Sequence, residues 1–274
     1  MDIGSLDNHR QSEDGVLVYP VFSRRSQGLS MGINLFPDRK ECLFDCAYCQ
    51  IFPFSNESSF SLDVMEESLV KAIKEAQSRE IVVKDICFSG NGEPTQSPHF
   101  PSALEIAFGL RDKYIPESDL VLITNGTGLL YESIFDLLLK TSLRERGLEI
   151  WLKLDAGTPL WYNNINRSHT PYESLVDTIK DFTKKAPVTL QTMICLVNDE
   201  APSPVEAKAW EALVREIAVN SKELKAIQIY GKARSSPGDP LAASLPIEFL
   251  EARAESIRNV LTLAEKNIPV RVFN

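Results

Sequence analysis

Three cysteines stand close together near the start of the chain, within the sequence ECLFDCAYCQ. Cys42, Cys46 and Cys49 are spaced C-x3-C-x2-C, and they follow an apolar, strand-like run at 29–35 and a short loop. Three thiolates can hold three irons of an iron–sulfur cubane, whereas an electron-transfer cluster normally has four cysteine ligands. The spacing therefore predicts a 4Fe-4S cluster in which one iron is open to another ligand.

Two other interpretations of these cysteines stay open. Positions 42, 46 and 49 would share one face of a helix, so the three side chains could be buried and inert. A structural zinc site needs four ligands, and with no other His or Cys nearby in the sequence, the fourth would have to come from a distant part of the chain. The chain has five cysteines, and this clustering favours metal binding in a reducing compartment over a set of disulfides.

A glycine-rich segment follows the next predicted strand, at 85–89. It contains Gly90, Asn91, Gly92 and Glu93. Glycines let the backbone approach a ligand closely, and the glutamate offers an anionic acceptor. The segment predicts a binding site for a small ligand, with an ordinary glycine-rich turn as the alternative.

Polar side chains also end the next two predicted strands. Thr124 and Asn125 close one of them, where a simple Asn-Gly turn is the alternative. At the end of the other strand, Lys153 and Asp155 alternate so that they share one face. A lysine and an acid inside a protein are costly unless they pair or bind a ligand. We therefore expect both at a functional site.

Together these residues resemble the radical S-adenosylmethionine superfamily, whose hallmark is C-x3-C-x2-C with an aromatic residue just before the last cysteine. Tyr48 holds that position. The resemblance implies that the open iron chelates S-adenosylmethionine, and that an electron from the cluster cleaves it to methionine and a 5′-deoxyadenosyl radical. The implied cofactors are therefore a 4Fe-4S cluster and S-adenosyl-L-methionine.

The resemblance also implies roles for individual residues. The segment 90–93 would bind the amino group of the methionine moiety, and Asn91 departs there from the double-glycine form of the family. Lys153 or Asp155 would contact the ribose, the carboxylate or the substrate, and both are candidate catalytic residues. The remaining candidates for cofactor binding are Tyr48, Thr124 and Asn125.

Within the superfamily, the stretches YPVFSRRSQGLSMGINLFP, LKLDAGTP and NINR resemble the group related to the wyosine-forming tRNA enzymes, 4-demethylwyosine synthase-like, with bacterial members of unassigned function. Those tRNA enzymes use additional N-terminal cysteines, and this chain has none before Cys42. A net charge of −9 gives no overall basic field to attract nucleic acid. We therefore expect the radical chemistry and keep a tRNA-modifying enzyme as an alternative.

The resemblance implies a flavodoxin- or ferredoxin-type reductant as a partner. The sequence does not identify the substrate, and the short chain is compatible with a macromolecular one, RNA or protein, that covers the mouth of the site. Two further alternatives are a glycyl-radical activase, and a non-catalytic iron–sulfur or zinc protein whose metal spectrum S-adenosylmethionine would leave unchanged.

Four other residues are weaker candidates. Arg24 and Arg25 precede the first barrel strand, and we expect them near the mouth, where they could hold a carboxylate or phosphate. His169 lies in a polar loop, where solvation is the usual state. Cys195 follows a predicted strand, and a small core residue is the simpler interpretation.

The elements that must position these residues alternate between apolar strand-like runs and helical periodicity. Because parallel strands need crossover connections, the alternation predicts an α/β fold, a partial (β/α)6 TIM-like barrel of parallel strands with outer helices. In such folds the chemistry sits beyond the carboxyl ends of the strands, where the motifs above fall. The predicted strands are 29–35, 85–89, 120–124, 149–154, 188–193, 226–229 and 269–273, and the predicted helices are 61–79, 100–113, 134–142, 172–185, 204–220 and 247–267.

Length and composition suit one large core, since the chain has 274 residues and 43% of them are hydrophobic. We expect residues 1–15 to be a disordered N-terminus and residues 16–274 to form one radical S-adenosylmethionine domain. No apolar run approaches the ~20 residues of a membrane span, and the first residues are acidic and lack the apolar stretch of a signal peptide. A cytoplasmic protein without a membrane partner is the expectation.

Overall fold

The structure is a computed structural model that describes residues 14–237 and 239–273. The predicted disordered segment 1–15 lies outside the described residues except for its last two, and the single domain over 16–274 stays a prediction. Internal contacts divide the chain into two compact units, each described here by itself. The first unit comprises Met1–Cys42, Pro53–Thr124 and Arg144–Glu149, and the second comprises Leu43–Phe52, Asn125–Leu143 and Ile150–Asn274.

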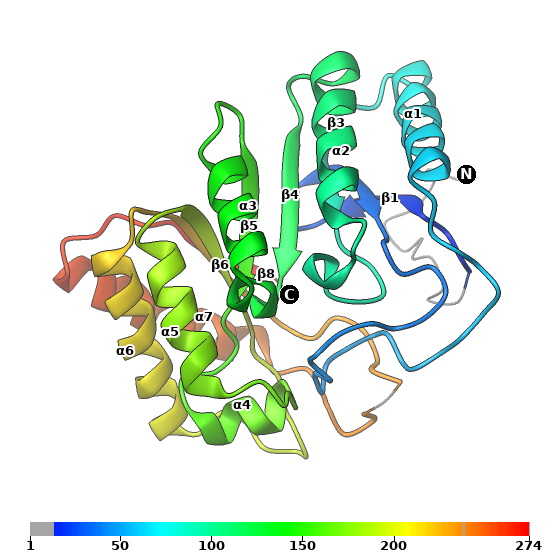
Figure 1. Cartoon of the computed structure of the whole chain (residues 1–274). Coiled ribbons are helices and arrows are strands. Elements are labelled where there is room, and N and C mark those ends of the chain that lie inside the picture. Colours follow the sequence, from blue (N-terminus) through cyan, green and yellow to red (C-terminus); the bar gives the residue numbers. More distant parts are fainter. Residues whose placement is uncertain (1–13, 238, 274) are drawn as a thin grey trace. The chain divides into compact units, whose positions relative to one another are not determined.

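The first unit carries four strands and two α-helices (Figure 1). In chain order its elements are β1 (Val18–Ser23), β2 (Gly28–Ile33), α1 (Leu62–Ser78), β3 (Val83–Phe88), the short 3-10 helix η1 (Pro94–Gln96), α2 (Phe100–Tyr114) and β4 (Asp119–Thr124). The strands lie in the order β1-β2-β3-β4. The hairpin β1–β2 is antiparallel, whereas β2 pairs with β3 and β3 with β4 in parallel.

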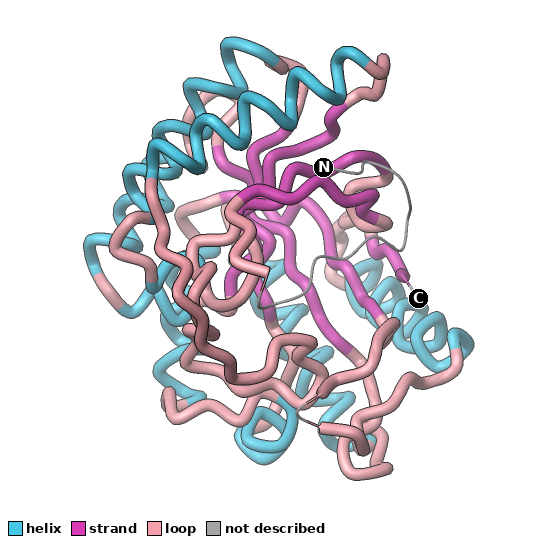
Figure 2. The backbone as a smooth tube through the Cα atoms, turned by 90° about the vertical axis from the view of Figure 1, so that its right-hand side faces the viewer, coloured by secondary structure: helices cyan, strands magenta, loops and turns pink. Residues whose placement is uncertain are grey.

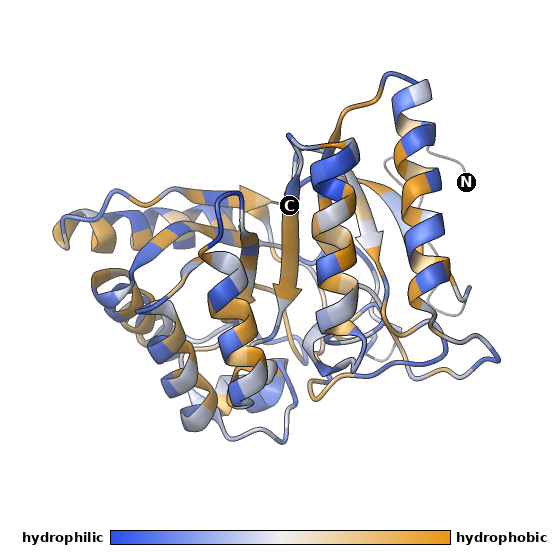
Figure 3. Cartoon of the chain, turned by 45° about the horizontal axis from the view of Figure 1, so that its top comes forward, coloured by the Kyte–Doolittle hydropathy of each residue, from blue (hydrophilic) through white to orange (hydrophobic). Residues whose placement is uncertain are grey.

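Local sequence explains how α1 forms and which face it buries. The Ser61 side chain accepts a hydrogen bond from the Val64 amide and so caps the first turn. Hydrophobic and hydrophilic residues alternate along α1 and α2 in Figure 3, and the apolar residues of each helix form its buried face. Phe88 of β3 meets Phe100 of α2 edge to face, with ring centroids 5.4 Å apart. The buried residues of α1 are Met65, Leu69, Ala72, Ile73 and Ala76.

The second unit carries most of β5, three further strands and five α-helices. Its elements are η2 (Thr127–Leu130), α3 (Glu132–Ser142), β5 (Leu148–Lys153), α4 (Pro159–Ile165), α5 (Tyr172–Thr183), β6 (Pro187–Met193), α6 (Pro204–Asn220), β7 (Glu223–Tyr230), α7 (Ile247–Leu263) and β8 (Val270–Phe273). The strands β5, β6, β7 and β8 pair in parallel in that order. Figure 2 shows the strands side by side with helices packed along them.

The short helix α4 is fixed at its start. Thr158 caps it by accepting a hydrogen bond from the Trp161 amide. The carboxylate of Glu206, in α6, accepts hydrogen bonds from the Gly157 amide and the Thr158 hydroxyl, each at 2.5 Å. A Cβ on Gly157 would stand 2.1 Å from the backbone nitrogen of Trp210. The loop between β5 and α4 therefore packs directly on α6, and only glycine fits at residue 157.

Within the described residues, six strand–helix units follow one another, from β2–α1 to β7–α7, and β8 ends the series. The strands β2, β3 and β4 pair in parallel, and so do β5, β6, β7 and β8. This repeat of strand and helix confirms the predicted α/β class and the elements of a (β/α)6 arrangement. One strand, one α-helix and the two short 3-10 helices were not predicted. Strand β1 contains Pro20, which is tolerated because β1 is an edge strand, and α4 has only seven residues. Helix α7 ends at Leu263, four residues earlier than predicted, because Glu265 adopts a positive φ of 58°.

The topology places the motifs at the carboxyl ends of strands. In the first unit, the loops 34–42 and 89–95 leave the neighbouring parallel strands β2 and β3 at the same edge of the sheet. In the second unit, Asp155 and Cys195 follow β5 and β6 at the corresponding edge of that sheet. In the described parts of the chain, none of the helices is long and apolar enough to cross a membrane.

Candidate functional site

In the first unit, the backbone just before Cys42 pairs with the glycine-rich segment. Glu41 and Gly92 form an isolated parallel β-bridge. The Glu41 amide donates to the carbonyl oxygen of Asn91 (3.2 Å), and the Glu93 amide donates to the carbonyl oxygen of Glu41 (2.9 Å). Since Cys42 is the next residue, the first cysteine of the motif is tied to the segment predicted to bind the methionine moiety.

Two glycines make this close approach possible. A Cβ on Gly92 would stand 1.9 Å from the carbonyl oxygen of Glu41. Gly90 has φ +134°, and a Cβ there would meet the side chain of Asn34 at 2.6 Å. These glycines therefore let the backbone pack closely against Glu41 and Asn34. Their close approach to a ligand stays a prediction.

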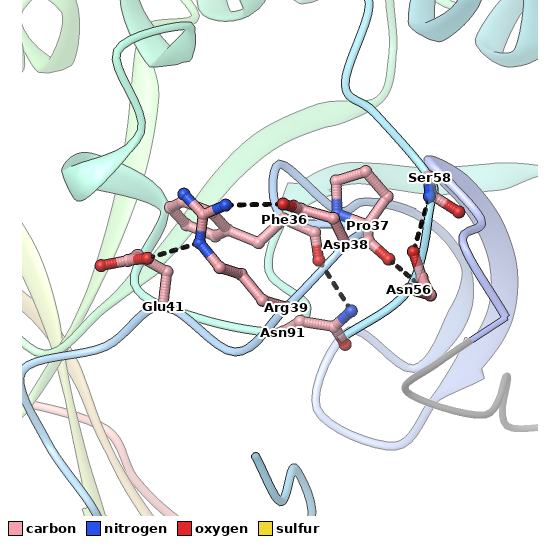
Figure 4. A network of polar contacts seen from close by, with 8 residues as sticks. All are labelled: Phe36, Pro37, Asp38, Arg39, Glu41, Asn56, Ser58 and Asn91. Atoms are coloured by element: carbon pink, nitrogen blue, oxygen red, sulfur yellow. Dashed lines mark hydrogen bonds and ion pairs between the residues drawn. The ribbon is translucent and has the colours of Figure 1, made fainter. Parts of the chain in front are cut away.

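A buried asparagine that the sequence analysis did not single out organises the same corner. The Oδ1 atom of Asn34 accepts hydrogen bonds from the Asn91 amide (3.1 Å) and the Phe36 amide (3.3 Å), and its Nδ2 donates to the carbonyl oxygen of Val16 (3.0 Å). The side chain of Asn91 donates to the carbonyl oxygen of Phe36 at 2.8 Å (Figure 4). Asn91, predicted to bind cofactor, thus holds the loop between β2 and Cys42.

The outer side of this loop is braced by polar contacts (Figure 4). The guanidinium of Arg39 bridges Asp38 (2.6 Å) and Glu41 (2.9 Å). Asn56 donates from its side chain to the carbonyl oxygen of Pro37 at 3.0 Å. Such exposed ion pairs add little stability each, but they fix the shape of the segment that ends at Cys42.

Glu93 lies buried and is met by two threonines. Its Oε1 atom accepts hydrogen bonds from the Thr95 hydroxyl (2.6 Å), the Thr95 amide (3.2 Å) and the Thr124 hydroxyl (2.7 Å). Thr124 is the last residue of β4, so the fold brings two of the predicted cofactor-binding residues into direct contact. These hydrogen bonds hold Glu93 as an oriented acceptor at the carboxyl ends of the strands of the first unit.

Asn125, which belongs to the second unit, makes a local turn. Its Oδ1 accepts hydrogen bonds from the amide (2.9 Å) and the hydroxyl (2.7 Å) of Thr127. Gly126 follows with φ +82°. This is the Asn-Gly turn that the sequence analysis named as the alternative. Cofactor binding by Asn125 stays a prediction.

In the second unit, the cysteine-bearing loop rests on the end of α4. The amides of Asp45 and Ala47 donate to the carbonyl oxygens of Asn166 (3.0 Å) and Ile165 (2.8 Å). The Cys49 amide donates to the carbonyl oxygen of Cys46 at 2.9 Å. The Asn166 side chain donates to the sulfur of Cys46 at 3.5 Å. Asn166 therefore contacts the predicted metal-ligand segment through both backbone and side chain.

Tyr48, Lys153 and Asp155, three of the predicted site residues, form one network of contacts in the second unit. The Tyr48 hydroxyl donates to Asp155 in a short hydrogen bond. The Lys153 ammonium donates to the hydroxyls of Tyr48 (3.0 Å) and Tyr230 (3.1 Å), and it lies 4.7 Å from the centroid of the Tyr48 ring. Asp155 also accepts from the Asn166 side chain (2.8 Å) and the Met193 amide (2.9 Å).

These contacts set the charge states of the group. Desolvation acts to lower the pKa of Lys153, but Tyr230 and Asp155 outweigh it, and the pKa is raised. Burial, with Asp155 nearby, raises the pKa of Tyr48 well above its ordinary value, so the hydroxyl keeps its proton and donates. Desolvation raises the pKa of the Cys46 thiol to about 11, against the opposing effect of Lys153. A metal that binds Cys46 must therefore displace a proton.

The chemistry of the donors fits an iron–sulfur cluster. Thiolates are the ligands that such clusters select, and the N–H of Asn166 already points to one of the sulfurs. Among residues 14–237 and 239–273, no group of three or more His, Cys, Asp or Glu lies close enough to hold a metal ion. Cys42 belongs to the first unit, and Cys46 and Cys49 belong to the second. The three-cysteine cluster stays a prediction.

The weaker candidates fall into different places. Arg167, which lies in the same polar loop as the candidate His169, forms a short ion pair with Asp239. His169 is exposed, as expected for a loop histidine. Cys195 is fully buried, and burial raises the pKa of its thiol to about 12. It has the burial of a core residue.

The expectation that Arg24 and Arg25 lie near the mouth is wrong. Both belong to the turn between β1 and β2, which leads into the amino end of β2, whereas the motifs leave the carboxyl ends. Arg25 lies near the buried Asp85 of β3 and acts to lower its pKa, while burial, the larger effect, raises it. The antiparallel hairpin, which the sequence analysis missed, is the reason for this placement.

Comparison of sequences identifies relatives without an assigned function. No family model matches the chain. A UPF0026 protein of Helicobacter pylori is 31% identical over 114 residues, which are 41% of this chain and 35% of the relative. A UPF0026 protein of Methanocaldococcus jannaschii is 29% identical over 153 residues, 55% of this chain and 43% of the relative. The matches thus span less than half the length of these curated relatives.

Comparison of structures gives the fold. A radical S-adenosylmethionine methyltransferase from Sphaerobacter thermophilus superposes with a TM-score of 0.64 at 14% identity, over 93% of this chain and 69% of that one. SuiB of Streptococcus suis, bound to S-adenosylmethionine, gives 0.65 at 14% identity, over 85% and 48%. TYW1, solved with a lysine–pyruvate adduct, gives 0.54 at 15% identity, over 84% and 73%. The predicted resemblance is therefore confirmed at the level of the fold, which this chain shares with radical S-adenosylmethionine enzymes.

Proposed function

We propose that this protein is a radical S-adenosylmethionine enzyme. Cys42, Cys46 and Cys49 would hold a 4Fe-4S cluster. When bound, that cluster would supply the electron that cleaves S-adenosylmethionine to methionine and a 5′-deoxyadenosyl radical able to abstract hydrogen from a substrate. The shared fold supports the class, and the reaction on the substrate is open.

One contact within the first unit is the main support for the proposal. The bridge between Glu41 and Gly92 joins the residue before the first motif cysteine to the segment predicted to bind the methionine amino group. The two sequence motifs are about fifty residues apart in the chain. Their direct pairing is what a site that binds a cluster and S-adenosylmethionine together requires, whereas an isolated structural metal site has no need of it.

The residues of each unit have distinct roles in this proposal. In the first unit, Glu93 accepts the amino group of the methionine moiety, and Thr124 keeps its carboxylate oriented. In the second, Asp155 already accepts three hydrogen bonds, so it acts as a fixed acceptor and not as a mobile proton carrier.

Lys153 is the cation among the candidate residues of the second unit. Two of its three donor hydrogens bond the tyrosines that hold it in place. The third is available for an anionic group, and the carboxylate of S-adenosylmethionine or of the substrate has the matching charge. Lys153 therefore binds and orients, and it keeps its proton while doing so.

The partners follow from the chemistry. A flavodoxin- or ferredoxin-type protein would supply the electron. SuiB has been solved with its precursor peptide SuiA, and for this chain too a macromolecular substrate, protein or RNA, is part of the proposal. Charge argues against a broad nucleic-acid surface, since the net charge is −9.

Anaerobic reconstitution with iron and sulfide tests the proposal. The reduced protein should form 5′-deoxyadenosine from S-adenosylmethionine, detected by chromatography, and S-adenosylmethionine should perturb the electron paramagnetic resonance spectrum of the cluster. The variant Cys46→Ala should lose iron and cleavage together. Cys87→Ala, a buried cysteine outside the motif, is the matched control and should keep both. A cluster that ignores S-adenosylmethionine would instead indicate an electron-transfer or structural metal protein.

A further inference from the structure

Asn166 links the predicted cluster ligand Cys46 to the acid Asp155. One hydrogen of its side-chain amide points to the Cys46 sulfur (3.5 Å) and the other to Asp155 Oδ2 (2.8 Å). The side chain is almost fully buried, at 2% exposure. Asn166 thus uses both amide hydrogens on two groups that the sequence assigns to the site.

The orientation of this amide is determined by its surroundings. The carboxylate of Asp155 can only accept, so a flipped amide would turn its oxygen towards that negative charge. The backbone is fixed as well, because the Asn166 amide donates to the carbonyl oxygen of Tyr162 (2.9 Å) and its own carbonyl oxygen accepts the Asp45 amide. The N–H that faces Cys46 is therefore held in place before any metal binds.

A donor held against a ligand sulfur has a defined electrostatic effect. Hydrogen bonds to cluster sulfurs stabilise the more negative, reduced state of the cluster and so raise its reduction potential. Asp155 has the opposite effect, because its negative charge disfavours added electron density on the nearby Cys46. Asn166 lies between them and donates to both.

We propose that Asn166 is a positioning residue that raises the reduction potential of the cluster by donating a hydrogen bond to Cys46. This inference rests on the proposed function, because it requires the cluster. It adds to the proposed function a residue outside the cysteine motif, directly after the end of α4, that controls how readily the cluster accepts its electron.

The test is a redox titration of the reconstituted full-length protein, followed by electron paramagnetic resonance. In Asn166→Leu, which keeps the volume and removes the donor, we expect the ratio of reduced to oxidised cluster at a given potential to fall about tenfold, a decrease of ~59 mV for a one-electron couple. Asn163→Ala, on the exposed side of the same helix, is the matched control and should keep the wild-type potential.

Two further variants separate the effect from loss of packing. Asn166→Ser keeps a hydroxyl donor and should recover part of the lost potential. Asp155→Asn removes the negative charge and should move the potential in the opposite direction, upwards. If the leucine variant does not hold a cluster, the serine variant decides, since its potential must lie below that of the wild type.

The outcomes distinguish this inference from the proposed function. Intact clusters with equal potentials in the wild type and the Asn166 variants would overturn the role of Asn166 and leave the enzyme class untouched. A wild-type protein that forms no cluster under anaerobic reconstitution would overturn both.

Discussion

The carbonyl oxygen of Glu41 occupies the place where a side chain on Gly92 would begin, only 1.9 Å from the ideal Cβ position. The contact is between backbones, so neither partner can swing aside. It lies inside the bridge that joins the cysteine-bearing loop to the glycine-rich segment. A single methyl group at Gly92 should therefore push the two motifs apart.

Gly92→Ala should destabilise the protein by about 1–3 kcal/mol, the usual cost of inserting atoms into a packed site. It should also lower the iron retained after reconstitution, because Cys42 follows Glu41 directly. Thermal denaturation and iron analysis measure the two effects. Gly109→Ala is the matched control: Gly109 lies in α2 with nothing near its Cβ position, and alanine there should stabilise by about 1 kcal/mol. Equal stability of the two variants would contradict the packing argument.

The hydroxyl of Thr124 donates to the buried carboxylate of Glu93 at 2.7 Å. Thr124→Val removes this donor with little change of shape, and hydrogen bonds to charged groups contribute about 1.5–3 kcal/mol. We expect that loss in urea denaturation, together with weaker binding of S-adenosylmethionine and an unchanged iron content. Thr127→Val, which loses a bond to the neutral side chain of Asn125, should cost about 1 kcal/mol. A Thr124 variant that binds S-adenosylmethionine as tightly as the wild type would argue against Glu93 as a ligand.

Lys153 stands between the hydroxyls of Tyr48 and Tyr230. Lys153→Met removes the cation and keeps much of the length, so formation of 5′-deoxyadenosine should fall about ten- to a hundredfold, the equivalent of one charged hydrogen bond, while iron binding persists. Tyr230→Phe keeps the ring and removes one hydrogen bond to the ammonium, and it should give a smaller loss. Product analysis by chromatography at saturating reductant compares the three proteins. A methionine variant with full activity would remove Lys153 from the site.

Much of the fold could be predicted because its signal is local. Apolar runs such as 188–193 and 226–229 became β6 and β7, and helical periodicity located α1 within a residue at each end. The misses also have local causes. Pro20 and the polar end of β1 hide an edge strand, α4 is too short for periodicity to register, and the positive φ of Glu265 ends α7 where the pattern continues.

The candidate site was predictable only in part. Residue types and spacing pointed to the cysteines, the glycine-rich segment and the pair Lys153 and Asp155. The roles of Asn34 and Asn166 could not be predicted in the same way, because each depends on a partner far away in the sequence. Asn91 is 57 residues from Asn34, and Cys46 is 120 residues from Asn166. The stretch NINR contained Asn166 and resembled a family motif, but only the three-dimensional contact shows which of its side chains faces Cys46.

Glu206 holds the loop before α4, and its contribution to the stability of the protein should depend on pH. Burial raises the pKa of this carboxyl group above its ordinary value, although the Gly157 amide and the Thr158 hydroxyl act to lower it. The native state therefore binds a proton more tightly than the unfolded chain does, and the contribution of Glu206 to stability is full below the ordinary glutamate pKa and declines as the pH rises through the raised value.

The variant Glu206→Gln carries no titrating group, so its stability relative to the wild type should improve as the pH rises from about 4 towards neutrality. Urea denaturation across that range measures the difference. Thr158→Val removes a bond that lowers the Glu206 pKa, so it should move the decline to higher pH, and the loss of the α4 cap should cost about 1 kcal/mol at every pH. Parallel stability curves for the wild type and the glutamine variant would show that Glu206 has the same pKa folded and unfolded. In that case the loop that carries α4, and with it Asn166, would be held by hydrogen bonds that do not change with pH.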